Sequence, residues 1–340
     1  MGRRRGITLA LGGLALAALL WPPAASAAGV PVFAPVSGRA SDILHLFIYV
    51  IVLSLIVFFG TEAALFYFVF RFRDRGNQEG EPEQIAGNRR LEMIWTAVPA
   101  IMLISVFVWV VVAMRQIGAP PAGGDPLTVE VIGHQWWWEY RYPDQGVVTA
   151  NELHIPTGET IHMKITSADV IHDFWAPQLG RKMDMIPGQI NEFYLHADQP
   201  GTYDGTCAEY CGAQHAWMRI RVIAQTPAQF NAWVAQQRQQ APPPPAGDAA
   251  RGEQDFLTGE GNCASCHTIA GTDAKGTVGP DLTHVGSRET LASGVLTNTP
   301  ANMRNWLTDP QAVKPDNRMP NPQLTNQEVI DIAAYLEGLK

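Results

Sequence analysis

Two uninterrupted apolar segments, Ile43 to Phe70 and Met93 to Met114, limit the possible folds of this chain more than any other feature. A helix needs about 20 apolar residues to cross a bilayer core, and each segment is long enough. The stretch between them, RFRDRGNQEGEPEQIAGNRR, carries five arginines, which favours the cytoplasm for this loop. We therefore expect a transmembrane hairpin whose two flanking regions lie on the outer side of the membrane.

The N-terminus is typical of an export signal. Three arginines precede an apolar run, and the small residues ASA precede an expected cleavage near Ala27. An uncleaved anchor helix is the alternative. Export agrees with the orientation that the arginine-rich loop predicts.

Charge is distributed unevenly along the chain. Residues 1–118 carry ten Arg, no Lys and seven acidic residues, a net charge of +3, whereas residues 119–340 carry fourteen basic and twenty-five acidic residues, a net charge of −11. An acidic outer region argues against nucleic-acid binding and suits a basic protein partner.

The outer region divides into a strand-rich part and a helix-rich part. The segments LTVEVIG, WWWEYRY, ETIHMKITS and NEFYLHA alternate apolar and polar residues between turn-forming residues, which predicts a β-sandwich or barrel. Thr226 is expected to cap a short helix with Pro227 in its first turn. A spacer with four prolines, Pro242 to Pro245, favours a semi-rigid tether, and the chain ends in the amphipathic helix NQEVIDIAAYLEGLK.

These patterns predict a multidomain membrane protein with a hairpin, a β-sandwich and an all-α C-terminal domain. The expected divisions are a signal peptide (1–27), an outer segment (28–42), transmembrane helices (43–70 and 92–114) around a cytoplasmic loop (71–91), a linker (115–125), a sandwich with its terminal helix (126–238), a Pro-rich linker (239–247) and a helical domain (248–340).

The helical domain contains CASCH, residues 263–267, which is the attachment signature of c-type haem. Cys263 and Cys266 would form thioether bonds to the haem vinyl groups, and His267 would bind the iron. A thioredoxin-like redox pair or a chance match is the alternative, but the adjacent histidine and the exported location favour haem.

A second axial ligand is expected downstream, since methionine raises the potential of a haem. Met303 lies in a predicted helix where packing is its ordinary role, whereas Met319 lies in the proline-bounded loop KPDNRMPNPQL and is favoured. Here the domain resembles class I cytochromes c. Its segment GPDL matches that family, and the resemblance implies that the carbonyl of Pro280 accepts the other N–H of His267.

The other two cysteines lie in CAEYCGAQHAWM, residues 207–218. A disulfide Cys207–Cys211 is one reading, because the compartment is oxidising. It leaves His215 and Met218 unexplained, and structural zinc has no use for methionine. Thiolate, imidazole and thioether together indicate copper, which needs a second histidine from upstream.

Among the upstream histidines, His172 in DVIHDFWAP precedes an aromatic turn at the end of a strand and is favoured. The remaining candidates are His134, His154, His162 and His196. Together with DMIPGQIN, GHQWWWEY and the hairpin, these motifs resemble subunit II of cytochrome c oxidase, the copper A protein, over roughly residues 40–235. With the attached cytochrome, the chain is similar to oxidases whose subunit II is fused to cytochrome c.

The resemblance implies a cupredoxin-like domain with a dinuclear copper A centre. The implied ligands are His172, Cys207, Cys211, His215, Met218 and the backbone carbonyl of Glu209. The side chain of Glu209 would reach a magnesium ion shared with subunit I, a hard ion that prefers oxygen.

The resemblance also implies roles for residues around this centre. Trp136 matches the tryptophan through which the family accepts electrons, while Trp137 and Trp138 are expected to pack at an interface and not to carry electrons. Asp169 matches an acidic residue that supports the copper domain. Glu92 matches a glutamate near the entrance of a proton pathway into subunit I, with an interfacial charge as the alternative.

The sequence therefore predicts the electron-accepting subunit of a haem-copper terminal oxidase. Electrons from an external cytochrome c-type donor, or from a quinol–cytochrome c reductase, would pass through haem c and copper A to subunit I, where oxygen is reduced. Glu62, within the first span, is expected to lie against a neighbouring subunit. An electron-delivery subunit for a nitric oxide or nitrous oxide reductase is the alternative. A non-redox sandwich with a disulfide is a third reading, and a quinol-oxidase subunit is disfavoured because it lacks the copper ligands.

Overall fold

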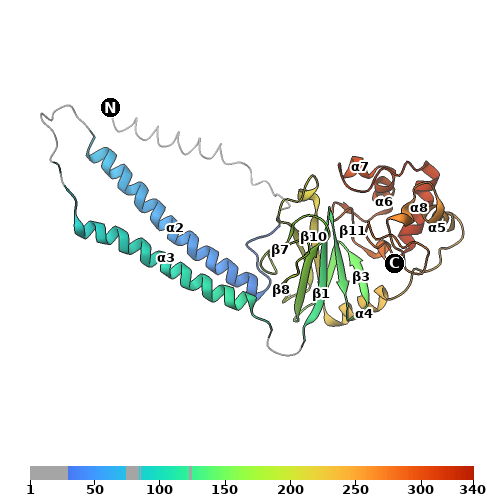
Figure 1. Cartoon of the computed structure of the whole chain (residues 1–340), viewed down its shortest axis with the longest axis horizontal. Helices are drawn as coiled ribbons and strands as arrows, with labels where there is room; N and C mark the ends of the chain where they lie inside the picture. The colour runs from blue at the N-terminus through green and yellow to red at the C-terminus, as the bar shows by residue number, and fades with distance from the viewer. Residues whose placement is uncertain (1–29, 74–83, 85, 122–124) are drawn as a thin grey trace, which may run out of the picture.

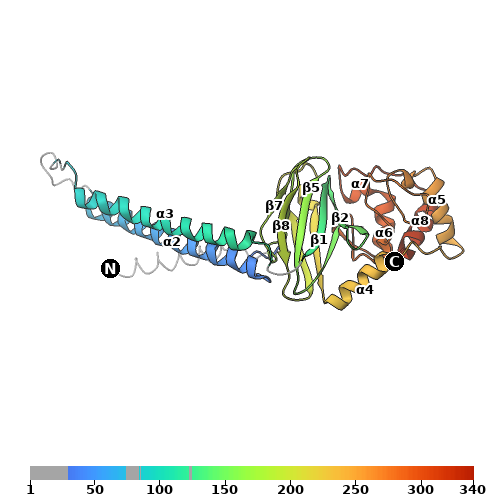
Figure 2. The same ribbon diagram turned by 60° about the horizontal axis from the view of Figure 1, so that its bottom comes forward.

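The computed structural model describes residues 30–73, 84, 86–121 and 125–340. It consists of two long helices, a β-sandwich and a helical C-terminal domain, with the sandwich between the other two parts (Figures 1 and 2). The expected signal peptide lies outside the described residues, as do parts of the cytoplasmic loop and the first linker.

The two long helices are α2 (Gly38–Arg71) and α3 (Arg89–Gly118), and each is long and apolar enough to cross a membrane. They lie side by side in Figures 1 and 2, joined by a 2.7 Å hydrogen bond between the hydroxyls of Tyr49 and Ser105. The side chains of Ser37 and Asn88 cap the two N-termini. Both helices extend several residues beyond the predicted apolar segments, because polar residues continue each helix past its apolar part.

The segment before α2 attaches the hairpin to the sandwich. Val36 donates a backbone hydrogen bond to Gln178 (2.8 Å) and accepts one from Asp198 (3.1 Å). The hydroxyl of Ser37, which also caps α2, donates to the carbonyl of Leu179 at 2.8 Å. The helix start and the edge of the sandwich are thus fixed by the same few residues.

The predicted sandwich is confirmed as two five-stranded sheets, ordered β3-β2-β1-β5-β8 and β4-β10-β9-β6-β7. The strands are β1 (Leu127–His134), β2 (Trp137–Tyr142), β3 (Val147–Ala150), β4 (Glu152–Pro156), β5 (Thr160–Ser167), β6 (His172–Trp175), β7 (Met183–Met185), β8 (Asn191–His196), β9 (Gly201–Cys207) and β10 (Arg219–Gln225).

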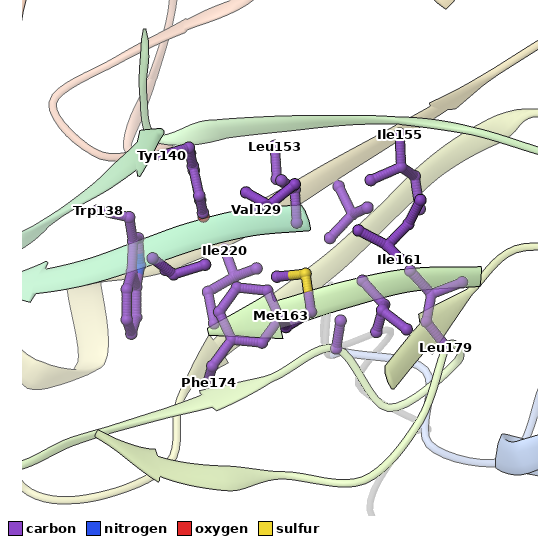
Figure 3. Close-up of a cluster of buried hydrophobic side chains, with 14 of the residues drawn as sticks. Val129, Trp138, Tyr140, Leu153, Ile155, Ile161, Met163, Phe174, Leu179 and Ile220 are labelled. Carbon is purple, nitrogen blue, oxygen red and sulfur yellow. The ribbon is translucent and has the colours of Figure 1, made fainter. Parts of the chain in front are cut away.

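Alternating side chains from both sheets meet in one core (Figure 3). In β5 every second residue is buried, so Ile161, Met163 and Ile165 face inward while their neighbours stay partly exposed. Trp138 and Phe174 close one end of this core, near the strand ends that carry the candidate copper site. The packed core therefore holds those strand ends in place.

A short helix and a small helical domain follow the sandwich. Thr226 caps α4 (Pro227–Gln237) and forms a capping box with Gln229. The C-terminal domain contains α5 (Asp248–Thr258), β11 (Thr290–Leu291), β12 (Leu296–Thr297), α6 (Pro300–Thr308), α7 (Pro310–Val313) and α8 (Asn326–Gly338). Helices α5 and α8 pack closely because Gly252 lies against the backbone of Asp331, where a side chain would collide.

Candidate copper and haem sites

The candidate copper ligands come from two adjacent strands and one loop. His172 begins β6, which pairs with β9, and Cys207 ends β9. Cys211, His215 and Met218 follow in the loop that leads to β10. Strand pairing therefore brings the distant histidine to the loop that carries the other candidates.

Neighbouring donor atoms of this set lie 3.3 to 3.9 Å apart. The two Sγ atoms are 3.8 Å apart, Nδ1 of His172 is 3.9 Å from Sγ of Cys207, and Nδ1 of His215 is 3.6 Å from Sγ of Cys211. The Met218 sulfur is 3.9 Å from Cys211, and the Glu209 carbonyl oxygen is 3.3 Å from Cys207. Both cysteines are free, so the structure does not contain the alternative disulfide.

The imidazole of His172 is oriented from two sides. Its Nε2 lies 2.8 Å from a carboxylate oxygen of Asp169, which leaves Nδ1 facing Cys207. The same carboxylate accepts backbone hydrogen bonds from Gln135 (2.6 Å) and Val170 (2.7 Å). On the other side, a side chain at Gly133 would lie 2.8 Å from the ring, so only glycine leaves room for it.

The two thiols differ in acidity. Contact with the Cys211 thiol lowers the pKa of Cys207 to about 3 against the effect of burial, and His172 adds to this shift. The thiolate beside it and burial raise the pKa of Cys211. Burial alone would lower the pKa of His172, but Asp169 and Cys207 outweigh it and raise the pKa. Cys207 therefore offers a thiolate to a metal cation, whereas Cys211 must lose its proton before its sulfur can bind one.

This donor set fits copper. His172, Cys207 and Cys211 are buried and their ligand atoms lie within 4.8 Å of one another. Thiolate, imidazole and thioether donors suit copper better than a hard ion, and burial keeps competing water away.

The candidate haem residues surround a cavity of about 620 Å³, a volume within the range of cofactor pockets. Cys263, Cys266 and His267 line it on one side, and Met303 and Met319 also line it. Met303 belongs to the core of α6 and is 2% exposed. Met319 lies in a loop, where its backbone is held by Gln311 and Asn317.

His267 is presented to the cavity by backbone contacts. Its Nδ1 lies 2.8 Å from the carbonyl oxygen of Pro280, and burial lowers its pKa despite this hydrogen bond. The ring is therefore neutral, with the Nε2 lone pair free for a metal. A side chain at Gly279 would collide with this ring. A free imidazole nitrogen, two thiols and a cavity of this size fit a covalently attached haem.

Trp136 lies between the two candidate sites. Its indole N–H donates to the carbonyl of Cys211 at 3.0 Å, and the residue also lines the haem cavity. Trp137 stacks on His134, whereas Trp138 is fully buried in the sandwich core and not at an interface. Trp136 thus contacts both the haem cavity and the loop between β9 and β10, residues 208–218, here called the copper-site loop.

The chain matches three family models. They are cytochrome c oxidase subunit II, transmembrane domain (residues 26–111), cytochrome c oxidase subunit II, periplasmic domain (147–225), and cytochrome c (249–340). Cytochrome c oxidase subunit 2 of Alkalihalophilus pseudofirmus is 34% identical over 84% of this chain and 83% of the relative. This chain belongs to the cytochrome c oxidase subunit II family.

A second relative agrees with this assignment. Cytochrome c oxidase subunit 2 of Bacillus sp. PS3 is 34% identical over 79% of this chain and 80% of the relative. The periplasmic domain of subunit II of the Bradyrhizobium japonicum cytochrome oxidase is 33% identical, and the match covers 34% of this chain and 96% of that domain, with a TM-score of 0.33. The chain is thus a membrane-anchored subunit of a haem-copper oxidase, an oxidoreductase, with a periplasmic copper-binding domain and a haem-binding cytochrome c domain.

The remaining predicted residues of this subunit II lie at its surface. The Glu209 side chain is exposed beside the copper-site loop, and Glu92 is exposed in the first turn of α3. Glu62 is partly exposed on α2. The four other candidate histidines contact different residues, outside the candidate copper ligands. His134 contacts Glu139, His154 contacts Gln225, His162 contacts Glu192 and His196 contacts Asp198.

The sequence did not single out several residues that shape the sites. Gly133 is a glycine inside a strand, a signal of close approach that was available. Gln135 donates its side-chain amide to the carbonyl of Cys211 at 2.8 Å. Lys314 is buried at the cavity wall, where burial lowers its pKa to about 7, and Arg288 also lines the cavity.

Proposed function

We propose that electrons from a cytochrome c-type donor reach subunit I of the oxidase through a covalent haem c and a dinuclear copper A centre of this chain. The cytochrome domain would hold haem through Cys263, Cys266, His267 and Met319. The copper domain would hold its ions through His172, Cys207, Cys211, His215, Met218 and the carbonyl of Glu209. Oxygen chemistry belongs to subunit I in this proposal.

The single observation that carries the proposal is the position of Trp136. The residue lines the cavity, while its indole N–H donates to the carbonyl of Cys211, a candidate copper ligand. A glycine, Gly212, lets the ring lie against the copper-site loop, because a side chain there would come within 2.9 Å of the indole. The contact supports a short path between the two sites through this one residue.

The protein's own contribution at the copper site is rigidity. Four of the candidate side chains, those of His172, Cys207, Cys211 and Met218, are buried against the sandwich core. The two cysteine thiolates would hold a copper pair, which would supply a carrier for one electron shared by both ions. A close-packed surrounding resists movement of the donors, which favours electron transfer with little rearrangement.

Two acidic residues support contact with the rest of the oxidase. Glu209 pairs a backbone carbonyl directed at the copper site with an exposed carboxylate, which suits a magnesium ion shared with subunit I. Glu92 lies where α3 begins, at the expected cytoplasmic surface, and could receive protons there for a pathway in subunit I.

The test is replacement of Trp136 by Phe in the assembled oxidase. We expect oxygen uptake with a soluble cytochrome c donor to fall about tenfold or more, while the haem c spectrum and copper content stay normal. The matched control is Trp137→Phe, which alters the same cavity wall without touching Cys211 and should stay near the wild-type rate.

Metal analysis and electron paramagnetic resonance complete the test. The proposal requires two copper ions per covalent haem and a signal from one electron shared by both ions. A single copper, or an unchanged rate in Trp136→Phe, would contradict it. Electron delivery to nitric oxide or nitrous oxide in place of oxygen would favour the alternative reductase.

A further inference from the structure

Two segments of the cytochrome domain lie directly on the copper domain. The first, here called the docking hairpin, is residues 289–297 and contains β11 and β12. The second, here called the docking loop, is residues 314–318 and leads into Met319. Residues of both segments line the haem cavity, so the two segments border the cavity where it meets Trp136.

Glu152 of β4 is the main contact to the docking hairpin. Its carboxylate is 2% exposed and accepts three hydrogen bonds, from the backbone N–H of Glu289 (3.1 Å), the backbone N–H of Thr290 (2.8 Å) and the Thr290 hydroxyl (2.7 Å). All three donors belong to the other domain. A carboxylate can be buried at low cost only with such partners, so this contact selects one position of the hairpin.

Contacts on β10 continue along the same hairpin. Arg221 donates to a carboxylate oxygen of Glu289 through Nε (3.1 Å) and a terminal nitrogen (2.6 Å). The backbone N–H of Arg219 donates to Ser293 at 3.3 Å, next to Gly294, where a side chain would approach Arg219 within 2.8 Å. The Arg221–Glu289 pair is partly exposed and contributes less than the buried carboxylate.

Lys314 is the main contact of the docking loop. It is 3% exposed, and its side-chain amino group donates to the carbonyl of Trp136 at 3.0 Å and to that of Ala292 at 3.3 Å. The lysine therefore joins the docking loop, the docking hairpin and the tryptophan between the two sites. A buried amine with both partners in place is specific to this arrangement of the domains.

Two further contacts connect the docking loop to the copper-site loop. The side-chain amide of Gln214 donates to the carbonyl of Pro315. Arg318 donates to the side-chain oxygen of Gln135, whose amide in turn donates to Cys211. The loop that carries the candidate haem ligand Met319 thus rests on residues that contact the copper-site loop.

We propose that the docking hairpin and docking loop hold the cytochrome domain on the copper domain in one fixed orientation, specified by Glu152 and Lys314. The proline-rich spacer alone predicts a tethered cytochrome that leaves and returns, whereas these buried polar contacts act across the interface itself. The proposal rests on the proposed function in one respect only: the docked orientation is the one in which the electron crosses near Trp136.

The experiment uses the assembled oxidase with a site-specific protease sequence inserted between Pro242 and Pro245. After cleavage, gel filtration in detergent follows the cytochrome fragment by its haem absorbance. We expect the fragment of the otherwise unaltered chain to stay with the complex. Glu152→Ala should weaken its binding about 100-fold, because two backbone N–H groups and a hydroxyl lose their acceptor. Lys314→Met, which keeps an apolar chain of similar length, should weaken it about tenfold.

Two exposed residues of the same charge serve as controls. Glu159→Ala in the copper domain and Lys275→Ala in the cytochrome domain should leave binding unchanged, since both are exposed and away from these contacts.

A second test variant, Glu152→Gln, preserves side-chain volume. Like Glu152→Ala, it should release the fragment, because its amide would face a backbone N–H. Copper content and the haem spectrum identify variants that fail to fold.

Two outcomes would overturn the proposal. The first is loss of the fragment from the unaltered chain on cleavage, and the second is full retention in Glu152→Ala. Retention in Lys314→Met alone would remove the role of the lysine. The copper-to-haem ratio of the same samples tests the proposed function separately, so a failure of docking is distinguishable from a failure of the cofactor assignment.

Discussion

The two cysteine pairs use the same side chains to build opposite kinds of site. Each site offers two cysteines and a methionine, with two histidines at the copper site and one at the haem site. In the copper domain the candidate donors contact one another at 3.6 to 3.9 Å on a close-packed sandwich. In the cytochrome domain they surround a cavity of about 620 Å³. The packed sandwich organises the copper site, whereas the cytochrome domain depends on a haem to fill the cavity between its side chains.

The two histidines show the same contrast. A side-chain carboxylate, that of Asp169, orients His172. A backbone carbonyl, that of Pro280, orients His267. The sandwich already holds the strand that carries His172, so one side chain, that of Asp169, is enough to orient the imidazole. The haem cavity is bordered largely by loops, and there a loop backbone carbonyl supplies the contact that orients His267.

The largest expected difference follows from removing each cofactor in turn. Replacing Cys263 and Cys266 by Ala would prevent the proposed covalent attachment of haem. At about 24 cal/mol per Å³, an unfilled cavity of this size costs on the order of 10 kcal/mol, which is comparable to the whole stability of a domain. We expect residues 248–340 to lose protection in hydrogen exchange, while the sandwich keeps its own.

The control for this comparison is the pair Cys207→Ala and Cys211→Ala. Without copper, the core around Trp138 and Phe174 still packs, so we expect protection in the sandwich to stay close to that of the intact chain. The proposed contrast between the sites would be wrong if both variants lost hydrogen-exchange protection to the same extent. It would also be wrong if the cytochrome domain without haem kept its protection.

A smaller effect separates the two methionines that line the cavity. Leu has nearly the volume of Met but lacks a sulfur donor, so Met319→Leu should lower the haem potential, by on the order of 0.1 V. Met303→Leu should leave the potential unchanged and cost under about 1.5 kcal/mol of stability, because this residue packs in α6. Redox titration with optical detection measures both.

The opposite result, a lower potential in Met303→Leu alone, would reassign the axial ligand to α6. The comparison is informative because both residues line the same cavity and only one lies in a loop. A potential that neither substitution changes would exclude both methionines as ligands.

Local patterns predicted much of this molecule. Apolar length predicted the two long helices, and alternation predicted strands β1, β2, β5 and β8. Thr226 marked the start of α4 because its side chain caps the helix directly. In each case the determining interaction lies within a few residues along the chain, where a sequence pattern can report it.

Contacts between distant segments were not predictable in this way. Glu152 and Thr290 are 138 residues apart, and nothing around Glu152 distinguishes it from an exposed strand residue. Lys314 precedes a proline in a polar loop, a setting that is typical of surface lysines. Their burial results from how two domains meet, which depends on the whole surface of each domain and not on residue spacing.

The last predicted effect concerns Asp169, which the resemblance implies is a structural support of the copper domain. In the structure, the Asp169 carboxylate accepts a hydrogen bond from Nε2 of His172. This contact orients the ring so that Nδ1 faces Cys207. In Asp169→Asn the amide can rotate its N–H₂ toward the ring, and the preference for that orientation is lost. We expect copper affinity to fall about 10- to 100-fold, measured by competition with a chelator.

The exposed residue Asp144 is the matched control, and Asp144→Asn should bind copper as the unaltered chain does. No side-chain substitution of this kind exists for His267, because its partner is a backbone carbonyl. If copper affinity in Asp169→Asn equalled that of the control, the sandwich alone would orient His172. The two histidines would then be fixed in the same way, by backbone and packing, and the contrast between the sites would reduce to the cavity.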